Sequence, residues 1–385
     1  METVSRRILS APVRLILLLA LCASVVAGCT TPPGGTPGGT TPPGLPTFPT
    51  APTTTTPALP KGVLTAYRSS TELGLVDGTK VVATAAGTFT PSSEPFVTED
   101  GRFLFARSTD GKLVTLDART GKSQDIPLPK ASRLGTAGAS TIVWWEQPNR
   151  LMQLDLAAEA VAPVLRQNVN LPQVANASDP MLLTARSGTA VVSRVESTPS
   201  PSGGPDTLYA VRGAGAPTSL GQADANTPVA VAELSPDGRT LAYALYRRSS
   251  NSCGTAAVVV SSADGSQQTY DVAAPGPTAS SEVLHMWWQA SHGMALSLGT
   301  WQCDPASAYS PRVWELGPDK LVQMTPPTVA LQAVEVVPGQ RALIIPQGGP
   351  TPEQSGTLVV EDSGRRFPVK PDVNALDVIP AQAPE

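Results

Sequence analysis

One stretch of the chain decides the fold class: Leu234-Ser235-Pro236-Asp237-Gly238-Arg239-Thr240-Leu241-Ala242. Pro and Gly favour a tight turn, and the Asp side chain accepts hydrogen bonds from the backbone that follows it. Apolar residues on both sides of such a turn favour short antiparallel strands. The stretch therefore predicts a β-hairpin.

The hairpin pattern recurs along the chain. Residues 100–106 (DGRFLFA) and 338–345 (PGQRALII) each place a Gly-containing turn before a short apolar strand. More strands follow each turn, and units of four strands can be placed at an average of about 46 residues, near the length of a propeller repeat. The predicted units lie near residues 95–130, 133–167, 172–222, 228–274, 281–326 and 328–370.

The two ends of this repeat region complement each other. Residues 61–90 supply only three strands, at 63–67, 73–76 and 80–84, whereas residues 375–380 (ALDVIP) repeat the pattern of a first strand. We therefore expect the last strand to complete the N-terminal sheet. Such pairing would close a ring of sheets and leave few strand edges exposed.

The Ser-Pro-Asp-Gly segment at residues 235–238 resembles the repeat of TolB-like and WD-repeat-like bacterial β-propellers, although no Trp-Asp dipeptide occurs. The resemblance implies an all-β domain over residues 61–385, with about seven four-stranded blades around one axis. Six or eight blades, or a pair of β-sandwiches, are the structural alternatives. The resemblance extends to the fold of that family and not to its partners.

Residues 1–28 predict an export signal. Arg6, Arg7 and Arg14 precede an apolar run at 15–26. A helix of that length reaches about 18 Å, which is too short for a hydrocarbon core of roughly 30 Å. Because Arg6 and Arg7 also resemble a twin-Arg motif, both the general secretory route and the twin-Arg route stay open.

Val26-Ala27-Gly28-Cys29 resembles the bacterial lipobox. The resemblance implies cleavage before Cys29, a diacylglycerol on its thiol, and a bacterial (actinobacterial) lipoprotein held on the extracytoplasmic side of the cell membrane. Ordinary secretory cleavage beside an unmodified Cys is the alternative. Residues 29–60 are rich in Thr, Pro and Gly, a composition that cannot bury enough apolar surface to fold, and they predict a tether.

The composition excludes several classes of function. Lys and Arg number 27 and Asp and Glu 31, so the basic excess of a nucleic-acid-binding protein is absent. The only histidines, His285 and His292, are expected at opposite ends of one strand, where they cannot share a metal ion. No phosphate loop or nucleophile elbow occurs, so we expect no cofactor, no metal and no catalytic residues.

Two aromatic pairs and two cysteines are expected to support the fold. Adjacent residues of a strand point to opposite faces, so Trp144-Trp145 and Trp287-Trp288 should each fill the gaps on both sides of one blade. Cys22 leaves with the signal and Cys29 carries the lipid. The remaining Cys253 and Cys303 fall in loops between the second and third strands of adjacent units, and we predict a disulfide between them.

The later units have long loops between their second and third strands, which predicts a binding sector on one face. Its candidate contact residues are Arg247, Arg248, Trp301, Asp304 and Tyr309. We predict a monomeric, non-catalytic binding platform for an envelope protein or a glycan. The alternatives are a hydrolase or lyase that uses clustered carboxylates, and a small-ligand sensor with an aromatic-lined axial pocket.

Overall fold

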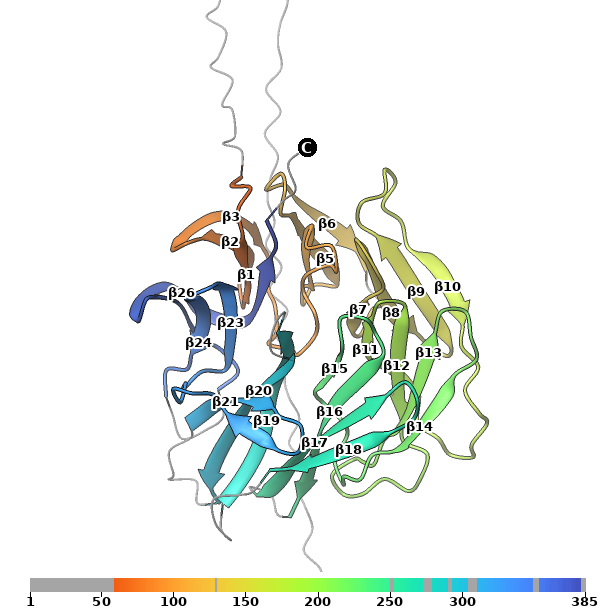
Figure 1. Cartoon of the computed structure of the whole chain (residues 1–385). Helices are drawn as coiled ribbons and strands as arrows, with labels where there is room; N and C mark the ends of the chain where they lie inside the picture. Colours follow the sequence, from red (N-terminus) through yellow and green to blue (C-terminus); the bar gives the residue numbers. More distant parts are fainter. Residues whose placement is uncertain are drawn as a thin grey trace, which may run out of the picture. The chain divides into compact units, whose positions relative to one another are not determined.

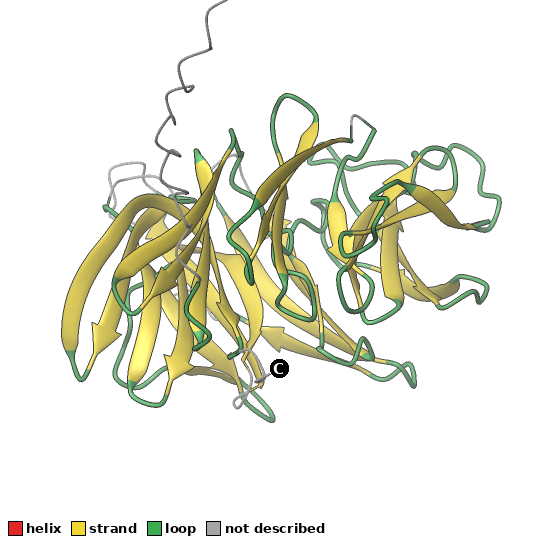
Figure 2. Ribbon diagram, turned by 90° about the horizontal axis from the view of Figure 1, so that it is seen from above, coloured by secondary structure: helices red, strands yellow, loops and turns green. Residues whose placement is uncertain are grey.

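The chain folds from β-strands joined by turns and loops (Figure 2). The computed structural model describes residues 59–128, 130–249, 253–272, 279–289, 293–303, 310–348 and 353–381, in which 26 strands and no helix occur. The prediction of an all-β domain is confirmed. Accordingly, the described residues include no helix that could cross a membrane. The signal, Cys29 and the tether up to residue 58 lie outside the described residues.

Consecutive strands form small antiparallel sheets that follow one another around a common centre, as in a β-propeller (Figure 1). Three of the sheets are β4 (Phe103–Arg107), β5 (Lys112–Asp117) and β6 (Ser123–Pro127); β7 (Leu134–Thr136), β8 (Thr141–Glu146), β9 (Arg150–Asp155) and β10 (Val164–Asn168); and β11 (Met181–Arg186), β12 (Thr189–Arg194), β13 (Thr207–Arg212) and β14 (Thr218–Gln222). Two more are β15 (Ala232–Leu234), β16 (Thr240–Arg248), β17 (Gly254–Ser262) and β18 (Gln267–Asp271); and β19 (Ala279–Gln289), β20 (Gly293–Gln302), β21 (Ser310–Leu316) and β22 (Leu321–Gln323). The largest has the order β23 (Gln332–Val337), β24 (Gln340–Ile345), β25 (Gly356–Asp362), β26 (Arg365–Ile379), β1 (Leu64–Ser69), β2 (Glu72–Asp77) and β3 (Lys80–Ala86).

The turn that decided the fold class holds β15 and β16 together. The Ser235 side chain accepts a hydrogen bond from the Thr240 amide, and Asp237 accepts one from the Arg239 amide. Gly238 has a φ of 67°, and a Cβ atom there would lie 2.8 Å from the Arg186 carbonyl oxygen. Glycine is therefore required both by the backbone angle and by the close approach of another sheet.

The C-terminal strand β26 belongs to two halves of the largest sheet. Its N-terminal half pairs with β25, and its C-terminal half pairs with β1, where Leu64 faces Ile379 and Thr65 faces Val378. The pairing expected for residues 375–380 is therefore present. The expectation of a separate strand there is wrong, because register shifts and a left-handed Asp372, with a φ of 61°, bend one continuous strand from one half to the other.

The buried apolar residues lie between sheets. Among the described residues, six apolar clusters join neighbouring sheets, and a seventh joins the two halves of the largest sheet. One of these clusters contains Tyr67, Ile344 and Leu376 and joins β24 and β26 to β1 and β2. This arrangement explains why the sheets need no helices to cover them.

The tryptophan pairs fill inter-sheet gaps as expected. Trp144 packs in the cluster shared with β4–β6, whereas its neighbour Trp145 packs in the cluster shared with β11–β13. Trp287 packs against β23 and β24, and Trp288 packs in the cluster shared with β16 and β17. Each pair therefore fixes its sheet against the neighbours on both sides.

Candidate functional site

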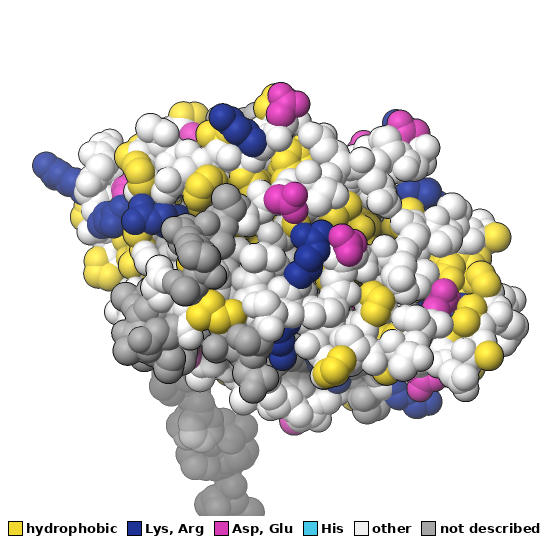
Figure 3. Space-filling model, turned by 90° about the horizontal axis from the view of Figure 1, so that it is seen from below, with side chains coloured by type: hydrophobic (Ala, Val, Ile, Leu, Met, Phe, Trp, Pro, Cys, Tyr) yellow, Lys and Arg dark blue, Asp and Glu magenta, His cyan; other side chains and the backbone are white. Residues whose placement is uncertain are grey.

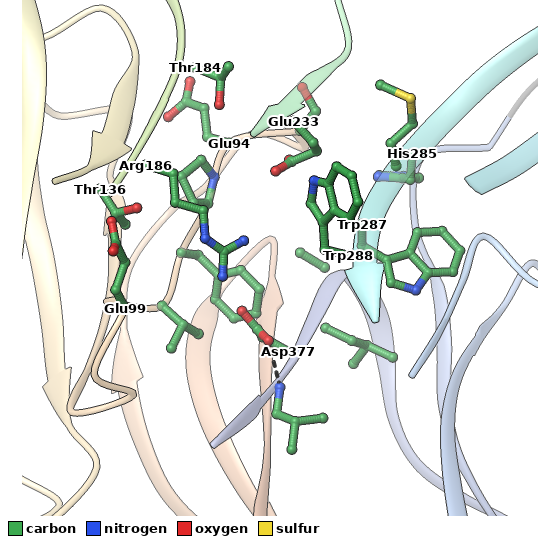
Figure 4. A pocket seen from close by; sticks show the side chains of 18 of the residues that line it. Glu94, Glu99, Thr136, Thr184, Arg186, Glu233, His285, Trp287, Trp288 and Asp377 are labelled. Carbon is green, nitrogen blue, oxygen red and sulfur yellow. Dashed lines mark hydrogen bonds between the residues drawn. The ribbon is translucent and has the colours of Figure 1, made fainter. Parts of the chain in front are cut away.

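A cavity of about 190 Å³ lies where the first strands of the sheets converge (Figure 4). Its wall is built from β7, β11, β15, β19, β23, the C-terminal half of β26, and residues 92–101. We call this space the axial cavity. Its ionisable lining residues are Glu94, Glu99, Arg186, Glu233, His285 and Asp377.

The turns between first and second strands close one end of the axial cavity, which we call the turn end. Glu99 accepts hydrogen bonds there from the Gly138 amide at 2.9 Å and from the Ser187 amide at 2.7 Å. The Ser187 hydroxyl lies 2.9 Å from the same carboxylate and 2.6 Å from the Pro236 carbonyl oxygen. Glu99 therefore ties together turns from three sheets, and its oxygens already have partners.

Arginines surround the carboxyl group at the opposite end of the cavity. Glu94 accepts a hydrogen bond from the Leu134 amide at 3.3 Å, and Arg133, Arg68 and Arg107 attract its negative charge. Burial nevertheless raises the pKa of Glu94, because the loss of water outweighs these attractions. Arg68 is itself 2% exposed and donates to Asn374, at 2.8 Å, so this end is an internally bonded network.

Arg186, Glu233 and Asp377 extend into the middle of the cavity from β11, β15 and β26, and we call them the central trio (Figure 4). Burial raises the pKa of Glu233 to about 8, with Arg186 and Arg133 opposing the rise and Asp377 adding to it. Burial also raises the pKa of Asp377, although a hydrogen bond from the Val378 amide at 2.7 Å acts in the opposite direction. Within the described chain, no carboxylate oxygen lies within 4.0 Å of the Arg186 guanidinium.

The remaining wall is aromatic and uncharged near neutral pH. Phe96, Trp287 and Trp288 line the cavity, and the indole N–H groups of both tryptophans are buried without an acceptor in the described part of the chain. His285 lies on β19 beside them. Burial, together with the charge of Arg68, lowers the pKa of His285 to about 4, so its imidazole is neutral at pH 7.

The predicted disulfide is present, whereas the predicted binding sector is only partly described. Cys253 and Cys303 form a disulfide between the β16–β17 and β20–β21 loops. Asp304 and Tyr309 lie outside the described residues, as does His292. Arg247 is held by Asp224 at 2.9 Å and Asp271 at 3.5 Å, Arg248 is exposed, and Trp301 is half-buried at the end of β20. The sector stays a prediction.

Sequence reasoning missed the central trio. A signal was available, because each member of the trio is a charged residue in or at the end of an apolar first strand. Glu233 lies between Ala232 and Leu234, and Asp377 lies between Leu376 and Val378. A charge at such a position must either find a partner across the axis or face a cavity.

The described residues contain no group of three His, Cys, Asp or Glu side chains that could hold a metal ion. On the face seen from below, basic and acidic side chains are interspersed, with no broad region of one sign (Figure 3). The chemistry available in the axial cavity is therefore that of a few desolvated charges beside aromatic rings.

No protein-family model and no curated protein sequence matches the chain. Solved structures with a similar chain path include a functionally unknown protein from Desulfotomaculum acetoxidans, with 10% identity, a TM-score of 0.49, and coverage of 83% of this chain and 99% of that one. Another is the β-propeller domain of Myceliophteria thermophila Cps50, with 13% identity, a TM-score of 0.48, and coverage of 74% and 90%. A third is the dihydro-heme d1 dehydrogenase NirN, with 14% identity, a TM-score of 0.46, and coverage of 86% and 77%. No property of these proteins is transferred to this chain.

Proposed function

We propose that the chain is a lipid-anchored, extracytoplasmic β-propeller of seven blades that binds a small ligand in its axial cavity without transforming it. The lipobox at Cys29 supports the anchor, and the membrane is reached through the tether. Six apolar clusters between neighbouring sheets, a seventh between the two halves of the largest sheet, and the pairing of β26 with β1 support a closed ring of seven blades.

The observation that carries the binding function is the central trio. Ionisable side chains that are withdrawn from water without close partners are costly to maintain in an empty protein, and such perturbed groups concentrate at functional sites. The volume of about 190 Å³ suits a small molecule rather than a polymer. The aromatic wall was the feature expected of a small-ligand sensor, so we favour that role over a platform for large partners.

Ligand screening of the full chain in detergent tests this function. A panel of amines, carboxylates, amino acids and monosaccharides should contain compounds that raise the melting temperature, because a ligand that binds only the folded state stabilises it. The increase should disappear in Glu233→Gln or Arg186→Met and persist in Arg212→Met, a substitution at an exposed site on β13. A panel without any cavity-dependent binder would contradict the proposal.

A hydrolase is the second candidate, because the cavity also gathers carboxyl groups. Glu233 is largely protonated at pH 7 and could donate a proton, while Asp377 lies close enough to influence its pKa. Incubation of the protein with each bound compound, followed by mass spectrometry, separates the two functions. Unchanged compounds after prolonged incubation support binding alone, whereas products that Glu233→Gln does not form support the hydrolase.

The location is tested separately at the anchor. Cys29→Ala should move the protein from the membrane fraction to the soluble exported fraction, because a protein without the diacyl chain loses its attachment. Retention of the variant in the membrane would contradict lipidation at Cys29. An envelope protein or glycan that binds the long-loop sector would add to the cavity function and would not replace it.

A further inference from the structure

The charges of the axial cavity differ in how completely the protein satisfies them. Glu99 accepts three hydrogen bonds at the turn end, and Glu94 lies among three arginines at the other end. The central trio, with one basic and two acidic side chains, has fewer protein partners than either of these groups. The Glu233 carboxyl group accepts no hydrogen bond from the described residues, and the Asp377 carboxyl group accepts one, from the amide of its neighbour Val378.

We propose that the axial cavity binds a small zwitterion of the α-amino acid type, with its carboxylate on Arg186 and its ammonium group between Glu233 and Asp377. This inference rests on the proposed function and specifies its ligand. The trio places acidic and basic side chains around one partly open cavity, Asp377 at its exposed side, without an ion pair between them. A ligand that carries both charges at short separation would complete the pairing on each side.

The geometry of the donors and acceptors favours a zwitterion over a simple amine or a sugar. A guanidinium presents a planar fork of N–H donors that matches a carboxylate. An ammonium group offers three donors, which suits two carboxylates that have few other donors. An amine alone would leave Arg186 unpaired, and a neutral sugar would leave all three charges without a counter-charge in a poorly hydrated space.

The wall also offers room for an apolar side chain. Phe96, Met286 and Trp287 line the cavity, and Met286 and Trp287 are 5% and 7% exposed. Trp287, on β19, lies on the other side of the drawn pocket from Arg186, on β11 (Figure 4). A ligand held by its charged end at the trio would direct its side chain toward this apolar surface.

Protonation of Glu233 couples ligand binding to pH. The charged groups that influence it are Arg186 and Arg133, which favour its ionised form, and Asp377, which opposes it. Glu94 and Glu99 are held at the two ends of the cavity, and His285 is neutral at pH 7. An ammonium group binds the ionised form, so a proton is released on binding. Affinity should therefore rise with pH up to about 8, by up to about tenfold per pH unit.

Titration calorimetry on the full chain in detergent tests the ligand class. The probes are the twenty α-amino acids, tested one by one, followed by the methyl ester and the N-acetyl derivative of the tightest binder. We expect at least one amino acid to bind, and each derivative, which lacks one of the two charges, to bind at least tenfold more weakly. Binding of either derivative with the same affinity as the parent amino acid would contradict the proposal that the ligand is a zwitterion.

Variants assign each charge to its partner. Arg186→Met should lower the affinity for the amino acid more than tenfold and should change the affinity for its methyl ester little. Glu233→Gln should lower the affinity for the amino acid and remove the rise of affinity with pH. Arg212→Met should bind the amino acid with the affinity of the wild type. If amines or sugars bind in a Glu233-dependent manner and no amino acid does, the ligand class is wrong and the cavity function stands. If no probe of either panel binds, both are wrong.

Discussion

Two glutamates on the same cavity, Glu99 and Glu233, illustrate two uses of a buried carboxyl group. Glu99 lies at the turn end and accepts hydrogen bonds from Gly138 and from the amide and hydroxyl of Ser187. The Glu233 carboxyl group lies at mid-height, without a hydrogen bond in the described part of the chain, and burial raises its pKa to about 8. The protein supplies hydrogen-bond donors to the first carboxyl group and none, among the described residues, to the second.

This difference teaches how to separate structural from functional charges in a fold of repeated sheets. A carboxylate that joins the turns of several sheets, as Glu99 does, contributes to stability through the hydrogen bonds that it accepts. A carboxyl group that the protein leaves without donors decreases the stability of the folded state as the pH rises above the pKa that the group has in the unfolded chain. The predictions below test this separation in order of decreasing effect.

Truncation of the chain before Asn374 should have the largest effect, because it removes one wall of the cavity. Leu376 and Ile379 are each 3% exposed, and loss of both, with the pairing to β1, should cost on the order of 5 kcal/mol or more. That is comparable to the total stability of many domains, so we expect aggregation or loss of cooperative unfolding, measured by calorimetry. Termination after Pro380 is the control and should leave the melting temperature unchanged.

Cys253→Ser combined with Cys303→Ser should weaken the fold without touching either glutamate. The two cysteines are 50 positions apart. A loop of that length contributes up to about 4 kcal/mol in the chain-entropy description of a disulfide. Denaturant unfolding should shift accordingly, while ligand affinity stays at the wild-type value. An equal loss of affinity would show that the disulfide shapes the cavity.

Glu99→Ala should destabilise the protein by about 2 kcal/mol at neutral pH, because three donors lose their acceptor in a half-buried place. Glu99→Gln keeps one acceptor oxygen, so its free energy of unfolding should lie between those of Glu99→Ala and the wild type. Chemical denaturation measures both. A melting curve of Glu99→Ala that coincides with that of the wild type would remove the distinction between the two glutamates.

Glu233→Gln should have an effect of the opposite sign, which is smallest near pH 5 and increases with pH. The pKa of Glu233 is about 8 in the folded chain against 4.5 in the unfolded chain, so the wild type loses stability as pH rises between these values. The variant cannot ionise and should be nearly equal to the wild type at pH 4.5 and more stable by about 2 kcal/mol at pH 6. Melting temperatures across this range test the expectation, with the exposed Glu159→Gln as control.

The sequence predicted the sheets well because their determinants are local. In the turn at residues 235–239, the Ser235 and Asp237 side chains accept hydrogen bonds from backbone amides of the same segment. Apolar runs on both sides identify the strands that the turn joins. The match between residues 375–380 and a first strand was sufficient to predict the pairing with β1. It was not sufficient to predict one continuous β26, because the bend at Asp372 depends on how two halves of a sheet meet.

The cavity could not be predicted in the same way. Arg186, Glu233 and Asp377 belong to three strands far apart in the chain, and only the arrangement around the axis brings them together. The sequence showed a charge in an apolar strand but not what faced it. The same limit applies to the long-loop sector, where exposure of Arg248 and ion pairs of Arg247 emerge only from packing.

The pairing of β26 with β1 also fixes an order of events in biosynthesis. Arg68, on the first strand, donates to Asn374, 306 positions later. A ribosome makes β1 first among the described strands and β26 last, so β1 waits with one unpaired edge while all other sheets can form. Distant pairings of this kind form slowly, and an open edge can recruit other chains. The newly made chain therefore needs protection at β1 until β26 has been made.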